Sequence, residues 1–463
     1  MSGIWQARDL QNALGVPVPA GWSAQGVAID SRELRAGELF VALVGARRDG
    51  HAFLAEAAGR GAAGCVVHRD GLAAGGVPLF RVDDTLEALR ALGAHARKRS
   101  RARVLAITGS VGKTGTKAAV AELLAAQGPT HASRKSHNNH IGVPLSLANL
   151  PEQARFAVFE LGMNHAGEIR RLVAQVRPQV ALVTWVAAAH LGHFADETEI
   201  ACTKAEIFTA TPPPEVAILP RDNPHYALLR ERAAACGVRE IITFGCHPES
   251  HWRVVHAELD AEGSRVRART PAGMLEFQLA LLGRHWVHNS LAVLAAVAAL
   301  GGDAAGAAAR FAELRPLPGR GQRIRLKVPG GSVLLLDDSY NANPASMRAA
   351  IEVLARQPGR RLAALGEMAE LGRSSAELHA ALAEPLQAAG VFRVFTCGDH
   401  MRHLHDRLPE GMRGDHAEDA GALVGRLVSM LRAGDVLLVK GSLASGMNRV
   451  VAALCAAFAV AED

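Results

Sequence analysis

The chain has 463 residues, too many for one ordinary hydrophobic core, and this length favours about three domains of roughly 100–200 residues each. Its composition, 49% hydrophobic and 21% charged, is that of a globular protein, and no apolar stretch is long enough to span a bilayer. The net charge of +6 suits anionic ligands. Because the basic residues lack interleaved aromatics and no zinc-finger or RNP1 signature is apparent, we expect no nucleic-acid partner.

The cysteines and the N-terminus both favour a cytoplasmic protein. The six cysteines contain no C-x-x-C pair and no zinc-ligand spacing, which is typical of small core residues in a reducing compartment. The first residues, MSGIWQARDLQNAL, carry charges where a signal peptide needs an apolar run. We therefore expect a cytoplasmic location and no membrane insertion.

Residues 1–102 are predicted to form a small N-terminal α/β domain. Two strand candidates, GELFVALVG and GCVVH, flank the helical segment AFLAEAAGRGA. A dense basic run, RKRSRAR at residues 97–103, follows. We interpret this run as a solvated linker to the next domain.

Residues 103–128 read RVLAITGSVGKTGTKAAVAELLAAQG and predict a strand, a glycine turn and a helix. Such a turn directs backbone N–H groups and the positive end of the helix at one point, where Lys113 adds charge and Thr114 a hydroxyl for Mg²⁺. Only Ser110 and Val111 separate the first glycine from Gly-Lys-Thr, whereas the usual phosphate loop has four intervening residues. The alternative is an ordinary turn with an exposed lysine.

The central domain is predicted to span residues 103–314. Glu160 ends the apolar strand FAVFELG, where open α/β sheets place ligands, so it is a candidate second Mg²⁺ ligand; the alternative is a carboxylate facing water. Downstream, AAAHLGHFADETEIACTKAEIF contains His190, His193 and Lys204. A cationic lysine cannot ligate a metal, but a carbamylated one presents a carboxylate. The alternative for Lys204 is a solvent-facing lysine paired with Glu206.

Residues 315–463 are predicted to form the last domain, entered through the hinge-like RPLPGRGQR. Its strand candidates SVLLLDD, RLAALGE, RVFTCGD and DVLLVKGS alternate with helical patterns, which predicts a doubly wound, mostly parallel sheet. After the first of them, Asp338, Tyr340 and Asn341 lie in a loop where a ligand would bind. Asn343 followed by Pro344 predicts the start of a helix.

At this point the motifs carry a family resemblance. TGSVGKT, ELGMNHAGEI, TKAEIF, GRHWVHNSLA, LPGRGQR, DDSYNANP, LGEMAELG and VLLVKGS occur in the order seen in the Mur ligases. The N-terminal IDSRELRAGELFVALVGARRDGHAF resembles the nucleotide-sugar domain of the same family. The resemblance covers nearly the whole chain. It implies a UDP-sugar-binding N-terminal domain, a central phosphate-loop ATPase-like domain and a C-terminal Rossmann-like ligase domain.

The resemblance also implies roles for individual residues. ATP contacts are implied at Gly109, Ser110, Gly112, Lys113, Thr114, Asn289, Arg320 and Asp338. Two Mg²⁺ ions are implied at Thr114, Glu160, His190 and a carbamylated Lys204, and the implied catalytic set is Lys113, Glu160, His190 and Lys204. Substrate contacts are implied at Ser31, Asn138, Asn139, Tyr340 and Asn341.

The implied activity is ATP-dependent amide-bond formation through an acyl phosphate. The DDSYNANP form implies UDP-N-acetylmuramoyl-tripeptide and D-alanyl-D-alanine as the small-molecule substrates. We expect a monomer. The family ligase that adds the preceding amino acid is the closest alternative, but its DNPR motif is absent. From another class, the chain could be a nucleotide-driven switch or motor ATPase, but a guanine switch would need N-K-x-D, which is also absent, and a switch would not need a whole C-terminal α/β domain with its own ligand loop. A non-catalytic nucleotide-binding protein would not require the intact lysine, threonine and glutamate set.

The chain departs from the family pattern at two places. Trp286 stands where the family usually has asparagine, so a polar contact there is lost or replaced. Gly192 and Ala195 stand where a glutamate and a glycine are expected, so only His190 is carried over from that segment.

Overall fold

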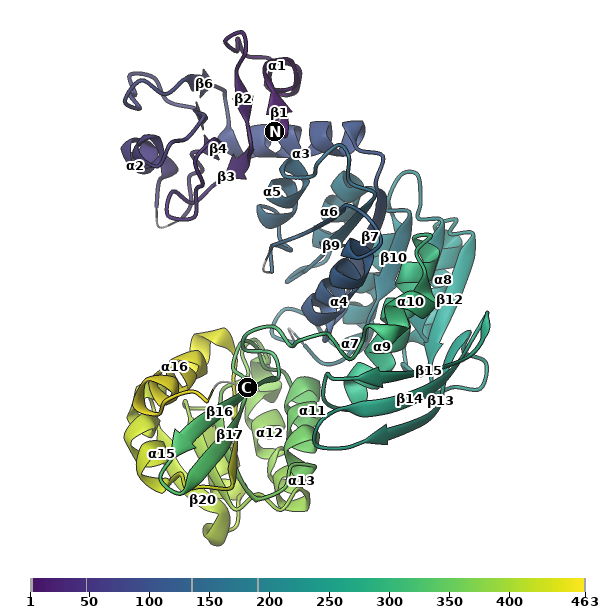
Figure 1. Cartoon of the computed structure of the whole chain (residues 1–463), viewed down its shortest axis with the longest axis vertical. Coiled ribbons are helices and arrows are strands. Elements are labelled where there is room, and N and C mark those ends of the chain that lie inside the picture. The colour runs from purple at the N-terminus through teal and green to yellow at the C-terminus, as the bar shows by residue number, and fades with distance from the viewer. Residues whose placement is uncertain (1–2, 47, 135, 190, 462–463) are drawn as a thin grey trace.

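The computed structural model describes residues 3–46, 48–134, 136–189 and 191–461, which form three α/β domains. Figure 1 shows them in an arc, with the N-terminal domain in purple, the middle domain in blue to teal and the C-terminal domain in green to yellow. The three-domain α/β class predicted from the sequence is confirmed. The domain boundaries at residues 102 and 314 stay predictions. In the described chain, no helix combines the length and apolarity that crossing a membrane requires.

The N-terminal domain is built on a four-stranded parallel sheet in the order β3-β4-β5-β6. Its strands are β1 (Trp5–Gln6), β2 (Ser23–Ala24), β3 (Gly26–Ala28), β4 (Glu38–Val41), β5 (Gly64–Val67) and β6 (Leu79–Arg81). Its helices are α1 (Ala7–Leu14), α2 (Leu54–Gly59) and α3 (Thr85–Arg99). The small antiparallel pair β1-β2 stands apart from the main sheet. Apolar side chains from both sheets and from α3 share one core.

The prediction of a solvated basic linker is wrong. Residues 97–99 are the last turn of α3, and Arg97 is buried. Its Nε donates to the carbonyl of Val176 at 2.7 Å and its Nη2 to that of Arg177 at 2.8 Å. Both carbonyls belong to the end of α6 (Glu168–Val176), where helix geometry leaves acceptors without partners. Arg97 therefore caps a helix of the middle domain and ties the two domains together.

The middle domain contains a nine-stranded sheet in the order β15-β14-β13-β12-β11-β10-β7-β9-β8. Its strands are β7 (Arg103–Thr108), β8 (Thr130–Ala132), β9 (Phe156–Glu160), β10 (Val180–Val183), β11 (Val216–Pro220), β12 (Glu240–Gly245), β13 (Trp252–Leu259), β14 (Ser264–Thr270) and β15 (Gly273–Leu279). Its helices besides α6 are α4 (Lys113–Ala125), α5 (Gly142–Ala148), α7 (Glu197–Ala205), α8 (Tyr226–Ala235), α9 (Arg284–Ala299) and α10 (Ala304–Ala309). The strands from β8 to β13 in this order are parallel, as the strand–helix alternation indicates. The antiparallel extension β13-β14-β15 was not anticipated, although β14 alternates buried and exposed residues.

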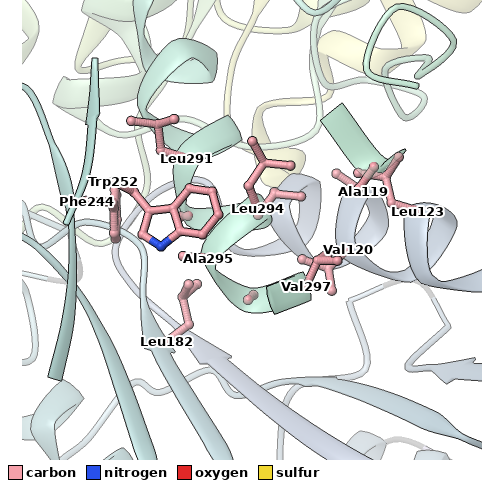
Figure 2. Packing of buried hydrophobic residues seen from close by; sticks show 14 of the residues in the cluster. Ala119, Val120, Leu123, Leu182, Phe244, Trp252, Leu291, Leu294, Ala295 and Val297 are labelled. Carbon is pink, nitrogen blue, oxygen red and sulfur yellow. The ribbon is translucent and has the colours of Figure 1, made fainter. Parts of the chain in front are cut away.

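Two helices cover one face of this sheet and fix the position of the phosphate loop. Figure 2 shows Val120 of α4 and Leu294 and Val297 of α9 among the buried apolar side chains of one cluster, together with Trp252. Close packing of this kind tolerates little displacement of either helix. The N-terminal ends of α4 and α9 are therefore held side by side at the edge of the sheet, as a contact between Gly112 and Asn289 described below confirms.

The C-terminal domain has a six-stranded sheet in the order β16-β17-β21-β18-β19-β20, parallel except for the pair β16-β17. Its strands are β16 (Gln322–Val328), β17 (Gly331–Asp338), β18 (Arg360–Gly366), β19 (Arg393–Cys397), β20 (Arg413–Ala417) and β21 (Asp435–Lys440). Its helices are α11 (Pro344–Ala355), α12 (Ser375–Ala380), α13 (Ala383–Ala388), α14 (Met401–Arg407), α15 (Val424–Met430) and α16 (Met447–Ala457). Separate apolar clusters cover the two faces of the sheet, so the doubly wound, mostly parallel prediction is confirmed.

Replacing Arg97 by alanine is expected to destabilise the junction between the first two domains. Each hydrogen bond from a charged group contributes about 1.5–3 kcal/mol, so the free energy of unfolding should fall by about 2 kcal/mol or more. Urea unfolding of the full chain measures this change. Lys98→Ala is the matched control, because Lys98 is exposed on the same helix. Equal stability of the two variants would contradict the capping role.

Candidate active site

The turn between β7 and α4 has a backbone that only glycine fits at two positions. Gly112 has φ of 83°, and a Cβ there would lie 2.9 Å from Nδ2 of Asn289. Gly109 has φ of 151°, and a Cβ there would lie 2.0 Å from Oγ1 of Thr184. The turn can therefore close against α9 and against the segment that follows β10 only because both residues lack side chains.

Side chains hold this turn in place. Ser110 Oγ donates to the carbonyl of Ala187 at 2.8 Å, and Thr184 Oγ1 donates to the carbonyl of Val111 at 2.6 Å. Lys113 Nζ donates to the carbonyl of Gly109 at 2.6 Å. Burial lowers the pKa of Lys113, which the charge of Glu160 opposes. An anion bound at the turn would favour the charged ammonium.

A cavity of about 630 Å³ opens beside the turn, between the middle and C-terminal domains. Twelve of the predicted site residues line it: Ser110, Gly112, Lys113, Thr114, Asn138, Glu160, Lys204, Asn289, Arg320, Asp338, Tyr340 and Asn341. They come from both domains and from segments more than 200 residues apart, from Ser110 to Asn341. The structure thus gathers most of the predicted site around one space.

Three predicted residues lie elsewhere. Gly109 supports the turn through its carbonyl and is not a lining residue. Asn139 Oδ1 accepts from the backbone N–H of Gly142, the first residue of α5, at 2.9 Å. Ser31 lies in the N-terminal domain, where its Oγ donates to Glu56 at 2.8 Å. His190 lies outside the described residues.

Glu160 is buried, and its two carboxylate oxygens have different partners. Its Oε1 accepts from Asn138 Nδ2 at 2.8 Å, whereas its Oε2 accepts no hydrogen bond from the described residues and lies 3.5 Å from Nζ of Lys117. A buried carboxylate oxygen without a hydrogen bond is costly and suits a cation ligand. With the Thr114 hydroxyl on the same cavity wall, these oxygens fit a Mg²⁺ ion.

Sequence reasoning missed Lys117. The side chain of Lys117 is buried in the second turn of α4, and its ammonium lies near the carboxylate of Glu160. The available signal was its spacing, because a residue four positions after Lys113 faces the same side of a helix.

Lys204 lies in α7 with its side chain almost fully buried against the cavity. Burial holds the pKa of this amine well below its usual value, and the charge of Lys113 lowers it further. Among the described residues, no partner makes a hydrogen bond or ion pair with Lys204. The alternative pairing with Glu206 is not observed, because Glu206 instead accepts from the N–H groups of Gly167 and Arg170 at the start of α6.

On the opposite wall, a second missed lysine organises the loop after β17. Lys440 ends the adjacent strand β21 and pairs in register with Asp338. Its buried Nζ donates to Asp338 Oδ2 at 2.7 Å and to the carbonyl of Asn341 at 2.8 Å. The strand VLLVKGS carried the signal, since a lysine at the carboxyl end of a buried strand faces the ligand edge of the sheet.

Polar contacts join the two walls. The Ser136 hydroxyl of the middle domain contacts Arg320 Nη2 at 3.3 Å and the Tyr340 hydroxyl at 3.2 Å. The guanidinium of Arg320 lies 4.1 Å from the centre of the Tyr340 ring. Asn343, which caps α11 ahead of Pro344 as predicted, also donates to the Ser110 carbonyl at 3.5 Å. The two domains are therefore in contact across the cavity.

Comparisons with known proteins identify the family. Family models described as the Mur ligase family catalytic domain, the Mur ligase middle domain and the Mur ligase glutamate ligase domain match residues 23–110, 107–297 and 319–443. The UDP-N-acetylmuramoyl-tripeptide–D-alanyl-D-alanine ligase of Escherichia coli is 38% identical over 92% of this chain and 93% of its own length. The chain belongs to the Mur ligase family. This confirms the resemblance drawn from the sequence motifs.

Solved structures of Mur ligases share the three-domain architecture. MurF from Acinetobacter baumannii is 30% identical, covers 97% of this chain and 98% of its own, and superimposes with a TM-score of 0.84. MurF from Thermotoga maritima in complex with ADP is 26% identical over 93% of this chain and 96% of its own, with a TM-score of 0.76.

Against the family pattern, Trp286 provides an apolar wall. It lies in the first turn of α9 and lines the cavity. A Cβ on Gly115 of α4 would lie 2.9 Å from Cζ2 of Trp286, so the indole occupies the space next to a helix residue without a side chain. The structure therefore shows Trp286 packed beside α4 at the cavity, and the loss of a polar contact at this position stays a prediction.

Lys440→Met is expected to loosen the Asp338 loop. The substitution keeps the apolar stem but leaves Asp338 and the Asn341 carbonyl without their donor, which should lower the free energy of unfolding by about 1–2 kcal/mol. Thermal and urea unfolding measure the change. Lys327→Met is the control, because Lys327 is exposed on β16 of the same sheet. A Lys440→Met protein as stable as this control would show that the contacts are dispensable.

Proposed function

We propose that the chain is an ATP-dependent ligase that joins D-alanyl-D-alanine to UDP-N-acetylmuramoyl-tripeptide and so makes the pentapeptide precursor of peptidoglycan. One observation carries the proposal: the glycine turn with Lys113 faces the Asp338–Asn341 loop across one cavity. The family relatives named as this ligase, at 38% and 30% identity over 92% and 97% of the chain, support the substrate assignment.

The reaction must make a carboxylate electrophilic. A carboxylate oxygen of the tripeptide attacks the γ-phosphorus of ATP, and ADP leaves with the electrons of the broken P–O bond. The amine of D-alanyl-D-alanine then attacks the acyl carbon, inorganic phosphate leaves, and the amine proton passes to solvent or a nearby base. Lys113 stabilises the charge of the transferring group from the turn.

The cavity walls divide the binding roles. In this proposal the turn residues Gly109, Ser110 and Gly112 hold the phosphates of ATP, while Asn289, Arg320 and Asp338 contact the rest of the nucleotide. Tyr340 and Asn341 lie near the dipeptide, and Asn138 and Asn139 face the tripeptide. Ser31 binds the uridine diphosphate end in the N-terminal domain.

Metal ions and a modified lysine complete the proposal. Thr114 and Glu160 hold one Mg²⁺, and His190 with a carbamylated Lys204 holds a second; when bound, these ions neutralise phosphate charge. The low pKa of Lys204 supports the modification, because only a neutral amine reacts with CO₂.

The ligase for the preceding residue is the less favoured alternative. A solved UDP-N-acetylmuramoyl-L-alanyl-D-glutamate–2,6-diaminopimelate ligase superimposes with a TM-score of only 0.53 at 18% identity, which speaks for the shared fold alone. The MurF structure from Acinetobacter baumannii reaches 0.84.

Phosphate release tests the proposed reaction directly. With UDP-N-acetylmuramoyl-tripeptide, ATP and Mg²⁺, we expect sustained release only when D-alanyl-D-alanine is added, and one pentapeptide formed per phosphate. A control with UDP-N-acetylmuramoyl-dipeptide and diaminopimelate or lysine should give no product. Turnover with the dipeptide acceptor, and none with the tripeptide, would assign the chain to the preceding step.

Lys113→Ala is expected to abolish turnover while the protein stays folded. The ammonium acts on developing phosphate charge, and losing such a group costs about 100-fold or more in kcat. Phosphate release measures the activity, and thermal unfolding without ligands checks the fold. Near-normal release from Lys113→Ala would contradict the phosphate-loop assignment.

Two substitutions of Lys204 distinguish a carbamate from a simple positive charge at this position. Lys204→Ala should be nearly inactive and partly restored by a small added carboxylate, which can occupy the vacant ligand position. Lys204→Arg should be inactive as well, because arginine keeps a positive charge but cannot carry a carbamate. A carbamate carbon signal in wild-type protein equilibrated with ¹³C-bicarbonate gives a readout independent of activity. An active Lys204→Arg enzyme would falsify the carbamate.

A further inference from the structure

Three side chains with metal-binding atoms meet at the rim of the cavity, outside the proposed site. Asp222 follows β11, Cys246 directly follows β12, and His288 lies near the start of α9. One ligand atom from each of the three lies within 4.8 Å of the other two. Among the described residues this is the one group of histidine, cysteine and acidic side chains with such geometry.

The spacing within the cluster suits a soft divalent metal. The Cys246 sulfur lies 3.4 Å from Nε2 of His288. Zinc binds sulfur at about 2.3 Å and nitrogen at about 2.0–2.1 Å, so two such atoms on one tetrahedral ion lie about 3.5 Å apart. A carboxylate oxygen can supply the third bond and water the fourth, as at zinc sites with an open position.

Backbone contacts hold the carboxylate of Asp222 in place. The N–H of Cys246 donates to Asp222 Oδ2 at 2.6 Å, an orienting bond to a ligand of the kind that supports metal sites. A Cβ on Gly245 would lie 1.8 Å from the same oxygen, so the carboxylate reaches Cys246 only because residue 245 is glycine. Asp222 and His288 are partly shielded, with side chains 24% and 21% exposed, whereas Cys246 is open to solvent. An ion can therefore enter.

We infer that Asp222, Cys246 and His288 form a binding site for Zn²⁺ or a similar soft divalent cation, and that its occupancy changes the affinity of the cavity for a nucleotide. On binding, the Cys246 thiol gives up its proton to solvent and the thiolate sulfur bonds the metal. Burial and the charge of Asp222 raise the pKa of this thiol, an effect that Arg284 opposes, so the metal itself must displace the proton. Mg²⁺ prefers oxygen ligands and does not compete for a thiolate.

The coupling to the nucleotide follows from the position of His288. This histidine also lines the cavity, as do Phe244 and its neighbour in the chain, Asn289. A metal bond fixes the imidazole toward Cys246 and places a hydrated ion at the cavity mouth. This coupling rests on nucleotide binding in the proposed reaction, whereas the metal site itself does not.

Cobalt titration of the full chain tests the site. Co²⁺ bound to a thiolate gives a sulfur-to-metal charge-transfer absorption, which we expect to saturate at one ion per chain and to disappear when Zn²⁺ is added. Cys246→Ser should remove the band, and Asp222→Asn should weaken Co²⁺ binding about tenfold or more. Cys236→Ser, at a partly exposed cysteine outside the cluster, should retain it. Absence of the band in the wild type, or its persistence in Cys246→Ser, overturns the site.

ADP binding measured with and without Zn²⁺ tests the coupling. Saturating Zn²⁺ should change the affinity of the wild type for ADP about fivefold or more relative to Cys246→Ser under the same conditions, since couplings of this kind span about 5–150-fold. The variant corrects for Zn²⁺ bound by ADP itself. An equal effect of Zn²⁺ on both proteins overturns the coupling, and a failure of both proteins to bind ADP would count against the proposed function.

Discussion

The cavity concentrates positive charge that the protein only partly neutralises, and the organisation of the site depends on this imbalance. Its lining includes Lys113, Lys204, Arg284, Arg320, Arg348 and Lys440 but only three acidic side chains, Glu160, Asp338 and Glu352. Burial lowers the pKa of Lys113 and of Lys204, which shows how unfavourable these charges are without a counter-ion. A polyanion relieves that cost. Binding of a nucleotide triphosphate is thus driven by groups whose charge is expensive in its absence.

The arrangement of domains matches this electrostatic requirement. The middle domain contributes the glycine turn and the C-terminal domain contributes Arg320 and the Asp338 loop, and the contacts between them include polar ones such as Ser136 with Tyr340 and the packing of Leu282 in an apolar cluster of the C-terminal domain. Relative motion of domains joined in this way is the ordinary expectation unless the interface is large and apolar. Substrates that bind to different domains can then enter separately before the walls exclude water around the acyl phosphate.

Features that depend on a few neighbouring residues could be predicted from the sequence, whereas contacts between distant residues could not. The turn at residues 109–114, the strand-end residues Glu160 and Asp338, and the Asn343–Pro344 helix start follow from patterns within a few residues, and each lies where its pattern predicts. Arg97 was misjudged because its partners at residues 176 and 177 are 79 and 80 positions away. Lys440 had a local signal at the end of a buried strand, but its partner Asp338 is 102 positions away. Long-range partners decide whether a basic residue is solvated or buried, and composition carries no record of them.

Cys246 is a further residue whose partners, Asp222 and His288, are distant in the chain and could not be predicted from local sequence. The sequence has no zinc-ligand spacing, yet parallel strands bring residues 222, 246 and 288 to one edge because their carboxyl ends align and α9 packs its first turn above them. The phosphate turn after β7 opens at that same edge, two strands away from β11 through β10. An open parallel sheet therefore places the loops after its strands along one edge, the edge at which ligands bind. Cys246 lies in one of these loops and His288 lines the cavity, so a metal held by both can connect its occupancy to nucleotide affinity without change elsewhere in the fold.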